Sequence, residues 1–319
     1  MKEKERVLVV RVPATSANLG PGFDTLGLAL NLYNTFSVTP ARLSSIHIAG
    51  EGEDRPKLRI DNVFVKIFNE VLEFYEYPRG HYKFSFHNDI PISRGLGSSS
   101  AVIIGAIVSA YHIMQKPLDA NEILNLALCY ENHPDNITPA LCGGFNIAML
   151  ESNKQPTKNT RKDSIFGSQK TRVVSMKTLI SSDIKAVVVV PNTTISTKFS
   201  RRTLPKKYST KDAVFNLSHA CMLSAAFLKG DYKLLREASG DRFHQDVRMK
   251  ALPILFAIQK LALENNALLS TLSGSGSSFL NICYADESKN LAELMQKSFP
   301  KFRVFELEFD NMGATLLES

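Results

Sequence analysis

Two glycines and three consecutive serines stand directly before the most apolar stretch of the chain. Gly95, Gly97 and the run Ser98 to Ser100 lead into AVIIGAIV, which is apolar enough to predict a helix buried on nearly all sides. One serine would be enough for a helix cap, and the glycines would serve a turn. Backbone N–H groups at such a helix N-terminus also bind anions, most often phosphate. The stretch is therefore either a capped turn or a phosphate site anchored on a buried helix.

The composition narrows the classes of function. The 319 residues, 44% of them hydrophobic, allow one large or two ordinary domains. No apolar run reaches the roughly 18 residues of a membrane span, and the N-terminal MKEKERVLVVRV does not resemble a signal peptide. We therefore expect a cytoplasmic protein without a membrane partner. The four cysteines and seven histidines lack the spacing of a zinc site.

The net charge of +7 comes largely from two basic stretches. These are residues 154–172 and 198–211, and neither interleaves aromatic residues as a base-stacking surface does. We therefore expect no nucleic-acid partner.

The order of strand and helix patterns predicts an α+β fold in two domains. Residues 7–12 have a strand pattern, and we expect this strand to end at Pro13. Asp119 is followed by a glutamate three residues later, which predicts a capped helix that runs on until Pro134 stops it.

A polar, basic segment from Glu151 to about Arg172 predicts a surface or interdomain loop. We place the domain boundary within it, with an N-terminal domain at 1–160 and a C-terminal domain at 161–319.

Two further loops are rich in small residues. The first, PATSANLGPGFDTLG, runs from Pro13 to Gly27 and carries Asn18 and Asp24 with no helix to cap. The second is SGSGSS at residues 273–278. Long loops in a compact domain are more often functional than idle.

Taken together, the three loops resemble the three motifs of the GHMP kinase superfamily, in the same order. PATSANLGPGFDTLGLAL is similar to the first motif of homoserine kinases, where mevalonate kinases and galactokinases carry a basic residue and a Glu-His pair. ENHPDNITPALCGG and STKFSRRTLP also look like homoserine kinase segments. The resemblance spans nearly the whole chain. It implies a two-domain GHMP kinase fold, with an N-terminal domain like ribosomal protein S5 domain 2 and a ferredoxin-like C-terminal domain.

The same resemblance implies a function. It is the ATP-dependent phosphorylation of the L-homoserine hydroxyl to O-phospho-L-homoserine, a step of threonine biosynthesis, by a homodimer that uses Mg²⁺. No Walker motif is present, so backbone N–H groups, the helix dipole and Mg²⁺ would meet the phosphate charge. The positions that match the ATP-binding segment are Pro91, Ser93, Arg94, Gly95, Leu96, Gly97, Ser98, Ser99 and Ser100.

The other implied roles are carried over position by position. The matching metal ligands are Ser99 and Glu131. The matching substrate-binding residues are Asn18, Asp24, Asn136, Thr197, Arg201 and Arg248, of which the two arginines suit the α-carboxylate. The matching catalytic residues are Asn18, Asp24, Glu131 and Asn136, and the C-terminal glycine loop contains Gly274, Ser275 and Gly276.

Three points stay open at this level. Asn136 stands near the reacting hydroxyl, where other superfamily members have an aspartate, so Asp24, Asp135 or the γ-phosphate itself could take the proton. Asn132 replaces the glycine usual in the family, and His133 is expected only to shape the turn before Pro134. The alternatives are a mevalonate-type kinase and a binding protein that holds nucleic acid with its basic loops.

Overall fold

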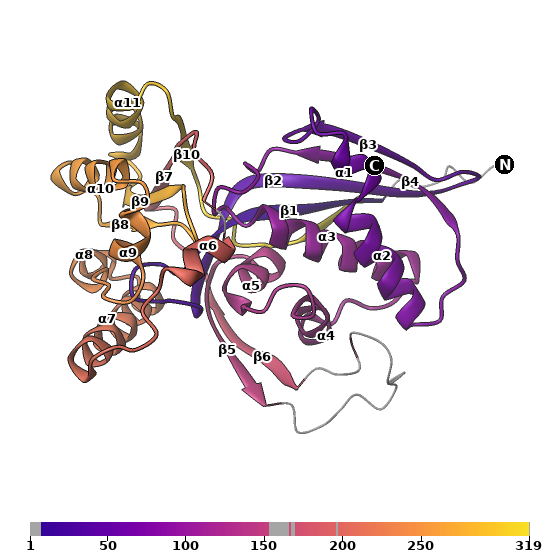
Figure 1. Ribbon diagram of the computed structural model, residues 1–319, viewed down its shortest axis with the longest axis horizontal. Helices are drawn as coiled ribbons and strands as arrows, with labels where there is room; N and C mark the ends of the chain where they lie inside the picture. Colours follow the sequence, from indigo (N-terminus) through magenta and orange to yellow (C-terminus); the bar gives the residue numbers. More distant parts are fainter. Residues whose placement is uncertain (1–7, 153–165, 167–169, 196, 319) are drawn as a thin grey trace.

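The chain folds around two β-sheets that lie side by side (Figure 1). The computed structural model describes residues 8–152, 166, 170–195 and 197–318. A seven-stranded sheet carries helices α2 to α5, and helices α7 to α11 lie on the side of a four-stranded sheet that is turned away from the larger sheet (Figure 1). No helix among the described residues is long and apolar enough to cross a membrane.

The larger sheet has the strand order β11-β1-β2-β4-β3, and β5 joins it by pairing with both β2 and β6. All its pairings are antiparallel except that between β3 and β4. Its strands are β1 (Leu8–Ala17), β2 (Leu26–Ala41), β3 (Ser45–Gly50), β4 (His81–Asn88), β5 (Phe145–Ser152), β6 (Thr171–Thr178) and β11 (Thr315–Glu318).

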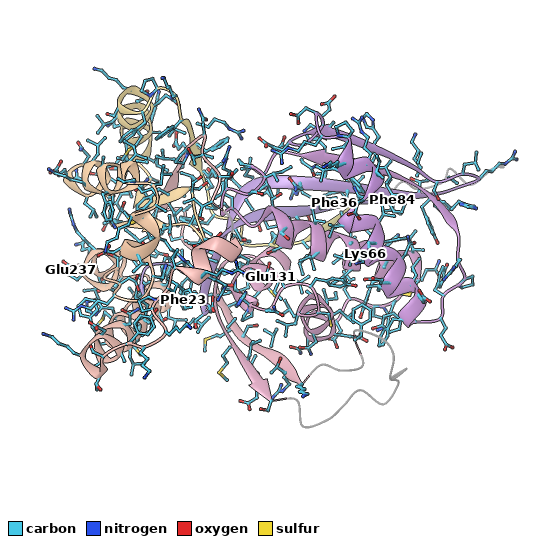
Figure 2. All side chains as sticks on the ribbon, viewed as in Figure 1. Phe23, Phe36, Lys66, Phe84, Glu131 and Glu237 are labelled. Atoms are coloured by element: carbon cyan, nitrogen blue, oxygen red, sulfur yellow. The ribbon has the colours of Figure 1, made fainter. Side chains whose placement is uncertain are left out.

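One face of this sheet is covered by helices because its strands alternate apolar and polar side chains. Phe36 of β2 and Phe84 of β4 face the helical layer (Figure 2), and Phe36 stacks on Phe64 of α2 with ring centroids 4.9 Å apart. Gly105 lets α3 approach the Phe36 ring directly. The helices of this half are α1 (Lys57–Ile60), α2 (Val63–Phe74), α3 (Ser98–Ile113), α4 (Ala120–Ala127) and α5 (Pro134–Cys142).

The smaller sheet is antiparallel throughout, in the order β10-β7-β9-β8. With helices after its first and third strands, this is the β-α-β-β-α-β arrangement of a ferredoxin-like domain. Its strands are β7 (Ile184–Val190), β8 (Leu269–Leu272), β9 (Phe279–Tyr284) and β10 (Arg303–Leu307). Its helices are α6 (Thr197–Arg202), α7 (Thr210–Lys229), the short 3₁₀ helix η1 (Tyr232–Leu234), α8 (Leu235–Ala238), α9 (Gln245–Met249), α10 (Ile254–Glu264) and α11 (Ser288–Ser298).

Two predicted element boundaries are wrong. β1 passes through Pro13 and continues to Ala17. The strand register shifts between Pro13 and Ala14, and such an irregularity tolerates a proline, which has no backbone N–H to donate to the neighbouring strand. Pro134 does not stop a helix but begins α5, where a proline at the first position loses no hydrogen bond. The cap at Asp119 is confirmed, since its carboxylate accepts from the backbone N–H groups of Asn121 and Glu122.

The domain boundary between residues 160 and 161 stays a prediction. It falls in the stretch 153–165, outside the described residues. β6 follows that stretch and still pairs with β5 of the larger sheet. β11 likewise returns to the larger sheet from the far end of the chain. The strands of the larger sheet therefore do not all precede one boundary in the chain.

Candidate active site

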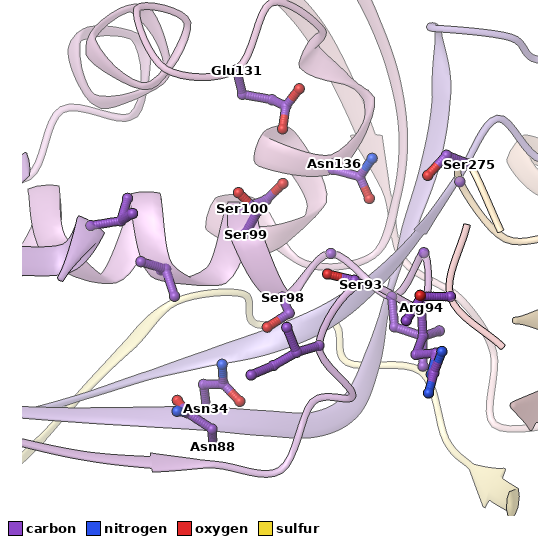
Figure 3. A pocket seen from close by; sticks show the side chains of 18 of the residues that line it. Asn34, Asn88, Ser93, Arg94, Ser98, Ser99, Ser100, Glu131, Asn136 and Ser275 are labelled. Carbon is purple, nitrogen blue, oxygen red and sulfur yellow. The ribbon is translucent and has the colours of Figure 1, made fainter. Parts of the chain in front are cut away.

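A cavity of about 650 Å³ opens where the two sheets meet. The loop after β1, the loop before α3, the N-termini of α3 and α5, and the 273–278 loop all reach it (Figure 3). The predicted site residues that line it are Asn18, Ser93, Arg94, Gly95, Leu96, Gly97, Ser98, Ser99, Ser100, Glu131, Asn136, Arg201, Arg248, Gly274 and Ser275.

The remaining predicted residues lie just outside this lining. Asp24 contacts it through Arg201, and Pro91 is buried at the start of the loop before α3. Gly276 follows Ser275 in the 273–278 loop. Thr197 begins α6, and its side chain lies outside the described part of the chain.

The N-terminus of α3 points into the cavity. Gly97 precedes the helix in a left-handed conformation, with φ +68°, and a Cβ there would overlap the Thr15 hydroxyl. The backbone N–H groups of the first turn, at Ser98 to Ser100, have no partner within the helix, as at every helix start. Together with the helix dipole they form a site for an anion.

Arg94 adds positive charge to this end of the cavity. Its Nη1 atom is buried without a hydrogen-bond partner. Burial lowers the pKa of Arg94, while the nearby carboxylate of Glu51 acts in the opposite direction. An arginine stays charged at neutral pH despite such a shift, so this unpaired N–H is available to an anionic ligand.

Hydrogen bonds fix the three loops to one another. The Asn18 amide donates to the Gly274 carbonyl oxygen at 2.9 Å and accepts from the Asp24 backbone N–H at 2.9 Å. The Ser273 hydroxyl donates to the Gly95 carbonyl oxygen at 2.7 Å. Segments more than 170 residues apart in sequence are thus held in one rigid wall.

Two guanidinium groups form the opposite end of the cavity. Arg248 is 3% exposed, and the Nε atoms of both Arg248 and Arg201 are buried without a partner. Burial, then the charge of Arg201, lowers the pKa of Arg248 to about 10, so it remains a cation at neutral pH. The Phe23 ring lies 5.3 Å from the Arg201 guanidinium and 5.2 Å from that of Arg248, which favours this close approach of like charges. Figure 2 labels Phe23 at the junction of the two halves.

His244 positions Arg248 through a direct contact. Its Nε2–H donates to the Gly20 carbonyl oxygen at 2.8 Å, so its Nδ1 is free to accept from Arg248 at 3.3 Å. Burial lowers the pKa of His244, which favours this neutral ring. The sequence interpretation missed His244. Its position four residues before Arg248 could have indicated the contact, because residues four apart on a helix lie on the same side.

A chain of polar contacts links Arg201, Asp24, His133 and Glu131 at the cavity. Arg201 holds Asp24 through two bonds of 2.5 and 3.1 Å. His133 lies 3.9 Å from the same carboxylate and 3.4 Å from that of Glu131. The expectation that His133 only shapes a turn was therefore too narrow, because the ring lines the cavity and bridges two predicted site residues.

Asn136 and Asp135 stand side by side at the start of α5. The Asn136 amide oxygen accepts from the Thr15 hydroxyl at 2.7 Å, which leaves its NH₂ group to donate toward the cavity. Asp135 is 3% exposed, and burial together with the Asp24 charge raises its pKa well above the usual range. A carboxyl group whose pKa is brought toward neutrality suits proton transfer.

The third end of the cavity is apolar. It is walled by Phe36, Ile48, Leu58, Val63, Phe64, Phe86, Ile92 and Val102. Two amides face it side by side (Figure 3): Asn34 has an unpaired buried NH₂ group and Asn88 an unpaired buried carbonyl oxygen. A donor next to an acceptor in an apolar slot fits the edge of a heterocyclic base. No sequence motif marked these residues, because they come from strands whose other side chains form ordinary core.

Comparisons with known proteins agree with this geometry. Residues 62–144 match the model for the GHMP kinases N terminal domain, and residues 223–301 match that for the GHMP kinases C terminal domain. A homoserine kinase of Helicobacter hepaticus is 71% identical over 98% of this chain and 100% of its own length. The chain belongs to the homoserine kinase family of GHMP kinases.

More distant relatives agree with this result in sequence or in fold. A homoserine kinase of Helicobacter pylori is 52% identical over 97% of the chain and 99% of its own length. The crystal structure of a homoserine kinase from Cytophaga hutchinsonii superposes with a TM-score of 0.81 at 22% identity, covering 99% of both chains. A Streptococcus pneumoniae phosphomevalonate kinase also shares the fold, with a TM-score of 0.70 at 10% identity, over 95% of this chain and 99% of its own. The predicted two-domain GHMP kinase fold is confirmed.

Proposed function

We propose that this protein is a homoserine kinase, which transfers the γ-phosphoryl group of ATP to the hydroxyl of L-homoserine and forms O-phospho-L-homoserine for threonine biosynthesis. The observation that carries the proposal is the pair of arginines, Arg201 and Arg248, which line the same cavity as the N-terminus of α3 and whose buried Nε atoms have no partner. A carboxylate binds to the two guanidinium groups, while a phosphate occupies the helix end.

The three ends of the cavity accommodate the parts of two substrates. The adenine enters the apolar end, where the Asn34 amide donates to a ring nitrogen and the Asn88 oxygen accepts from the exocyclic amino group. The triphosphate lies along residues 93–100 and the first turn of α3. Homoserine binds with its carboxylate at the arginines and its ammonium group beside Asp24.

The reacting hydroxyl of homoserine lies at Asn136 and Asp135. The free NH₂ group of Asn136 donates to the hydroxyl oxygen but cannot take its proton, because its own oxygen is occupied by Thr15. Asp24 is already held by Arg201 through two bonds. Asp135 lines the cavity beside Asn136, so we assign it as the carboxylate that accepts the proton. The rate should rise with pH as Asp135 ionises, and Asp135→Asn should lose this limb of the pH profile.

Mg²⁺ has suitable ligands in this site. The Ser99 hydroxyl and the Glu131 carboxylate line the same cavity (Figure 3), and Mg²⁺ prefers a few such oxygen ligands completed by water and phosphate. When bound, the ion would neutralise charge on the transferred phosphoryl group. A cytoplasmic location and a homodimeric state are further parts of this proposal.

An ADP-release assay with ATP and Mg²⁺ tests the proposal directly. The acceptors are L-homoserine, mevalonate, galactose, L-serine and L-threonine. We expect turnover with homoserine alone, at roughly the 1–100 s⁻¹ of typical kinases. Turnover with mevalonate instead would move the protein to the mevalonate-type kinases. ATP binding without turnover on any acceptor would favour a binding protein.

Two variants separate the two substrate sites. Arg248→Ala should raise KM for homoserine by roughly 100-fold or more and leave KM for ATP nearly unchanged, because the carboxylate loses its buried partner. Ser99→Ala should mainly lower kcat with Mg·ATP. Arg202→Ala is the matched control, since Arg202 is exposed next to Arg201 and does not line the cavity. Unchanged kcat/KM in both Arg248→Ala and Ser99→Ala would contradict this site assignment.

A further inference from the structure

Asp241 is a buried carboxylate that stands just before helix α9 and does not line the cavity. Its side chain is 1% exposed. Its Oδ1 atom accepts from the Asn216 side-chain amide at 2.8 Å and from the Phe243 backbone N–H at 3.0 Å. Its Oδ2 atom accepts from the backbone N–H groups of His244 at 2.9 Å and Gln245 at 2.7 Å. An ionised carboxylate has about four lone-pair sites and no donor, so these four N–H groups fill it.

These bonds hold the N-terminus of α9. The helix has only five residues, Gln245–Met249, and a helix this short needs support from outside. His244 stands at its N-cap position but makes no side-chain cap bond. The Asp241 carboxylate satisfies the N–H groups at the start of the helix instead. Asp241 therefore takes the role of the helix cap.

Asn216 connects this cap to helix α7. Its Nδ2 atom donates to Asp241, and its Oδ1 atom accepts from the Arg242 backbone N–H at 2.7 Å. One amide thus binds two successive residues of the segment that leads into α9. Asn216 is 2% exposed and belongs to a helix of 20 residues, which is a firmer support than a loop. The start of α9 is therefore anchored on α7.

The position of Arg248 depends on this anchor, because Arg248 lies in the last turn of α9. Its Nη1 atom contacts His244 Nδ1 at 3.3 Å and the Gly274 carbonyl oxygen at 3.1 Å. The side chain of Gln245 ties the same helix to β8, since its Oε1 atom accepts from the Leu272 N–H at 2.9 Å. These contacts direct the guanidinium group only while α9 keeps its place. A shift of about 1 Å would be enough to weaken the binding of a carboxylate strongly.

We propose that Asp241 is a positioning residue for substrate binding, which together with Asn216 holds α9 on α7 and so keeps Arg248 in the cavity wall. The inference rests on the proposed function, in which Arg248 binds the carboxylate of homoserine, and adds two residues that do not line the cavity. The charge of Asp241 matters as well as its shape. An asparagine at this position would turn its NH₂ group toward other N–H donors and leave them without a partner.

Steady-state kinetics with L-homoserine and ATP test this role. Asp241→Asn should raise KM for homoserine by about 10- to 100-fold and leave KM for ATP within about two-fold of the wild type. The matched control is Asp246→Asn, since Asp246 is an exposed aspartate of the same helix. L-Homoserinamide, which lacks the carboxylate, separates positioning from a general loss of structure. Its KM should rise far less in Asp241→Asn than that of homoserine.

Exchanging the two side chains tests the contact itself. Asn216→Asp alone sets two carboxylates against each other and should also raise KM for homoserine. In the double variant Asp241→Asn/Asn216→Asp, the amide donates from position 241 and the carboxylate accepts at position 216. Only the bond from the Phe243 N–H is then lost, so KM should return to within about five-fold of the wild type.

Asn216→Ala is a milder probe, because it leaves three of the four donors on Asp241. It should raise KM for homoserine a few-fold, and it carries the test if Asp241→Asn does not fold. Circular dichroism and Tm of each variant check the fold.

Unchanged KM for homoserine in Asp241→Asn or in Asn216→Ala would overturn the inference. So would an equal rise of KM for ATP or for homoserinamide, or a double variant no better than the two single ones. Each of these results would leave the proposed kinase activity standing, because the wild type shows that activity in the same assay. A wild-type protein that does not phosphorylate homoserine would overturn both.

Discussion

Helices α3 and α7 both carry apolar side chains on more than one side, yet they have different surroundings. α3 packs against the larger sheet, α2 and α5, and its side chains from Ser100 to Tyr111 are buried except Val102. Its N-terminus is open and faces the cavity. α7 is enclosed on one side only.

The difference shows that an apolar sequence does not tell how much of a helix its own chain covers. α3 is covered by its own chain, which leaves a rigid helix whose free N–H groups can bind phosphate. α7 has too few neighbours within the described chain to be enclosed, so its outer side chains stay exposed. One helix is open at its end and the other along its side.

The largest predicted effect is a loss of catalytic activity when the N-terminus of α3 is displaced. Gly97 and Gly230 border α3 and α7 with nearly the same left-handed backbone, φ +68° and +70°. In Gly97→Ala the new Cβ overlaps the Thr15 hydroxyl, which holds Asn136, so kcat/KM should fall by about 10³-fold as the N–H groups and Asn136 shift.

Gly230→Ala is the matched control for this change. Nothing lies within 4 Å of a Cβ at Gly230, so only the backbone strain of about 1–2 kcal/mol remains. Its Tm should fall while kcat/KM stays at the wild-type value. Equal losses of activity in the two variants would mean that strain alone, rather than the overlap at Thr15, damages the site.

The second prediction compares the free energy of unfolding that is lost when a side chain of α3 or of α7 is truncated. Ile104→Ala in α3 removes a fully buried side chain and should lower the free energy of unfolding by about 2–5 kcal/mol. Leu217→Ala in α7 should cost less than about 0.5 kcal/mol, because Leu217 is 67% exposed. Urea titrations of the two variants check this. A large cost of Leu217→Ala would show that Leu217 is packed within its own chain.

The smallest of the three predicted effects is the pH dependence of stability that the buried carboxyl group of Asp135 causes. Burial, then the Asp24 charge, raises the pKa of Asp135 in the folded state, so folding favours the protonated carboxyl. That preference is fully present below the ordinary aspartate pKa and is lost as pH rises through the raised value. Asp135→Asn should therefore be more stable than the wild type above pH 7, by roughly 1–3 kcal/mol, and nearly equal to it at pH 4.

Asp231→Asn, at the exposed end of α7, serves as the control for the charge prediction. It should change stability by less than about 0.5 kcal/mol at either pH. Denaturant midpoints measured from pH 4 to 8 provide the comparison. A difference between Asp135→Asn and the wild type that does not change with pH would argue against a raised pKa.

Much of the candidate site could be predicted from local sequence. Glycine-serine loops and the apolar run after Ser100 indicate a phosphate site and a buried helix, because backbone conformation and burial leave strong local signals. The cap at Asp119 is local in the same way. Arg201 and Arg248 could be named only through the resemblance to homoserine kinases.

What could not be predicted depends on contacts between distant segments. Asn34 and Asn88 face the cavity because β2 and β4 pair in a register that aligns them. His244 acts through Arg248 and Gly20, which is 224 residues away. The sequence predicts the role of Pro134 wrongly, because a proline can end one helix or begin the next, and only the packing of α5 decides between the two.

The pairing of β1 with β11 has a consequence for how the protein is made. β1 ends at Ala17 and β11 begins at Thr315, so the ribosome delivers one edge of the larger sheet almost a whole chain length after the other. At 5–20 residues per second, that delay lasts roughly 15–60 s. Throughout it, the hydrogen-bonding groups of β1 from Leu8 to Arg11 stay open on one side. The nascent chain therefore carries an unpaired strand edge until synthesis is nearly finished, and this edge can pair with other chains during that time.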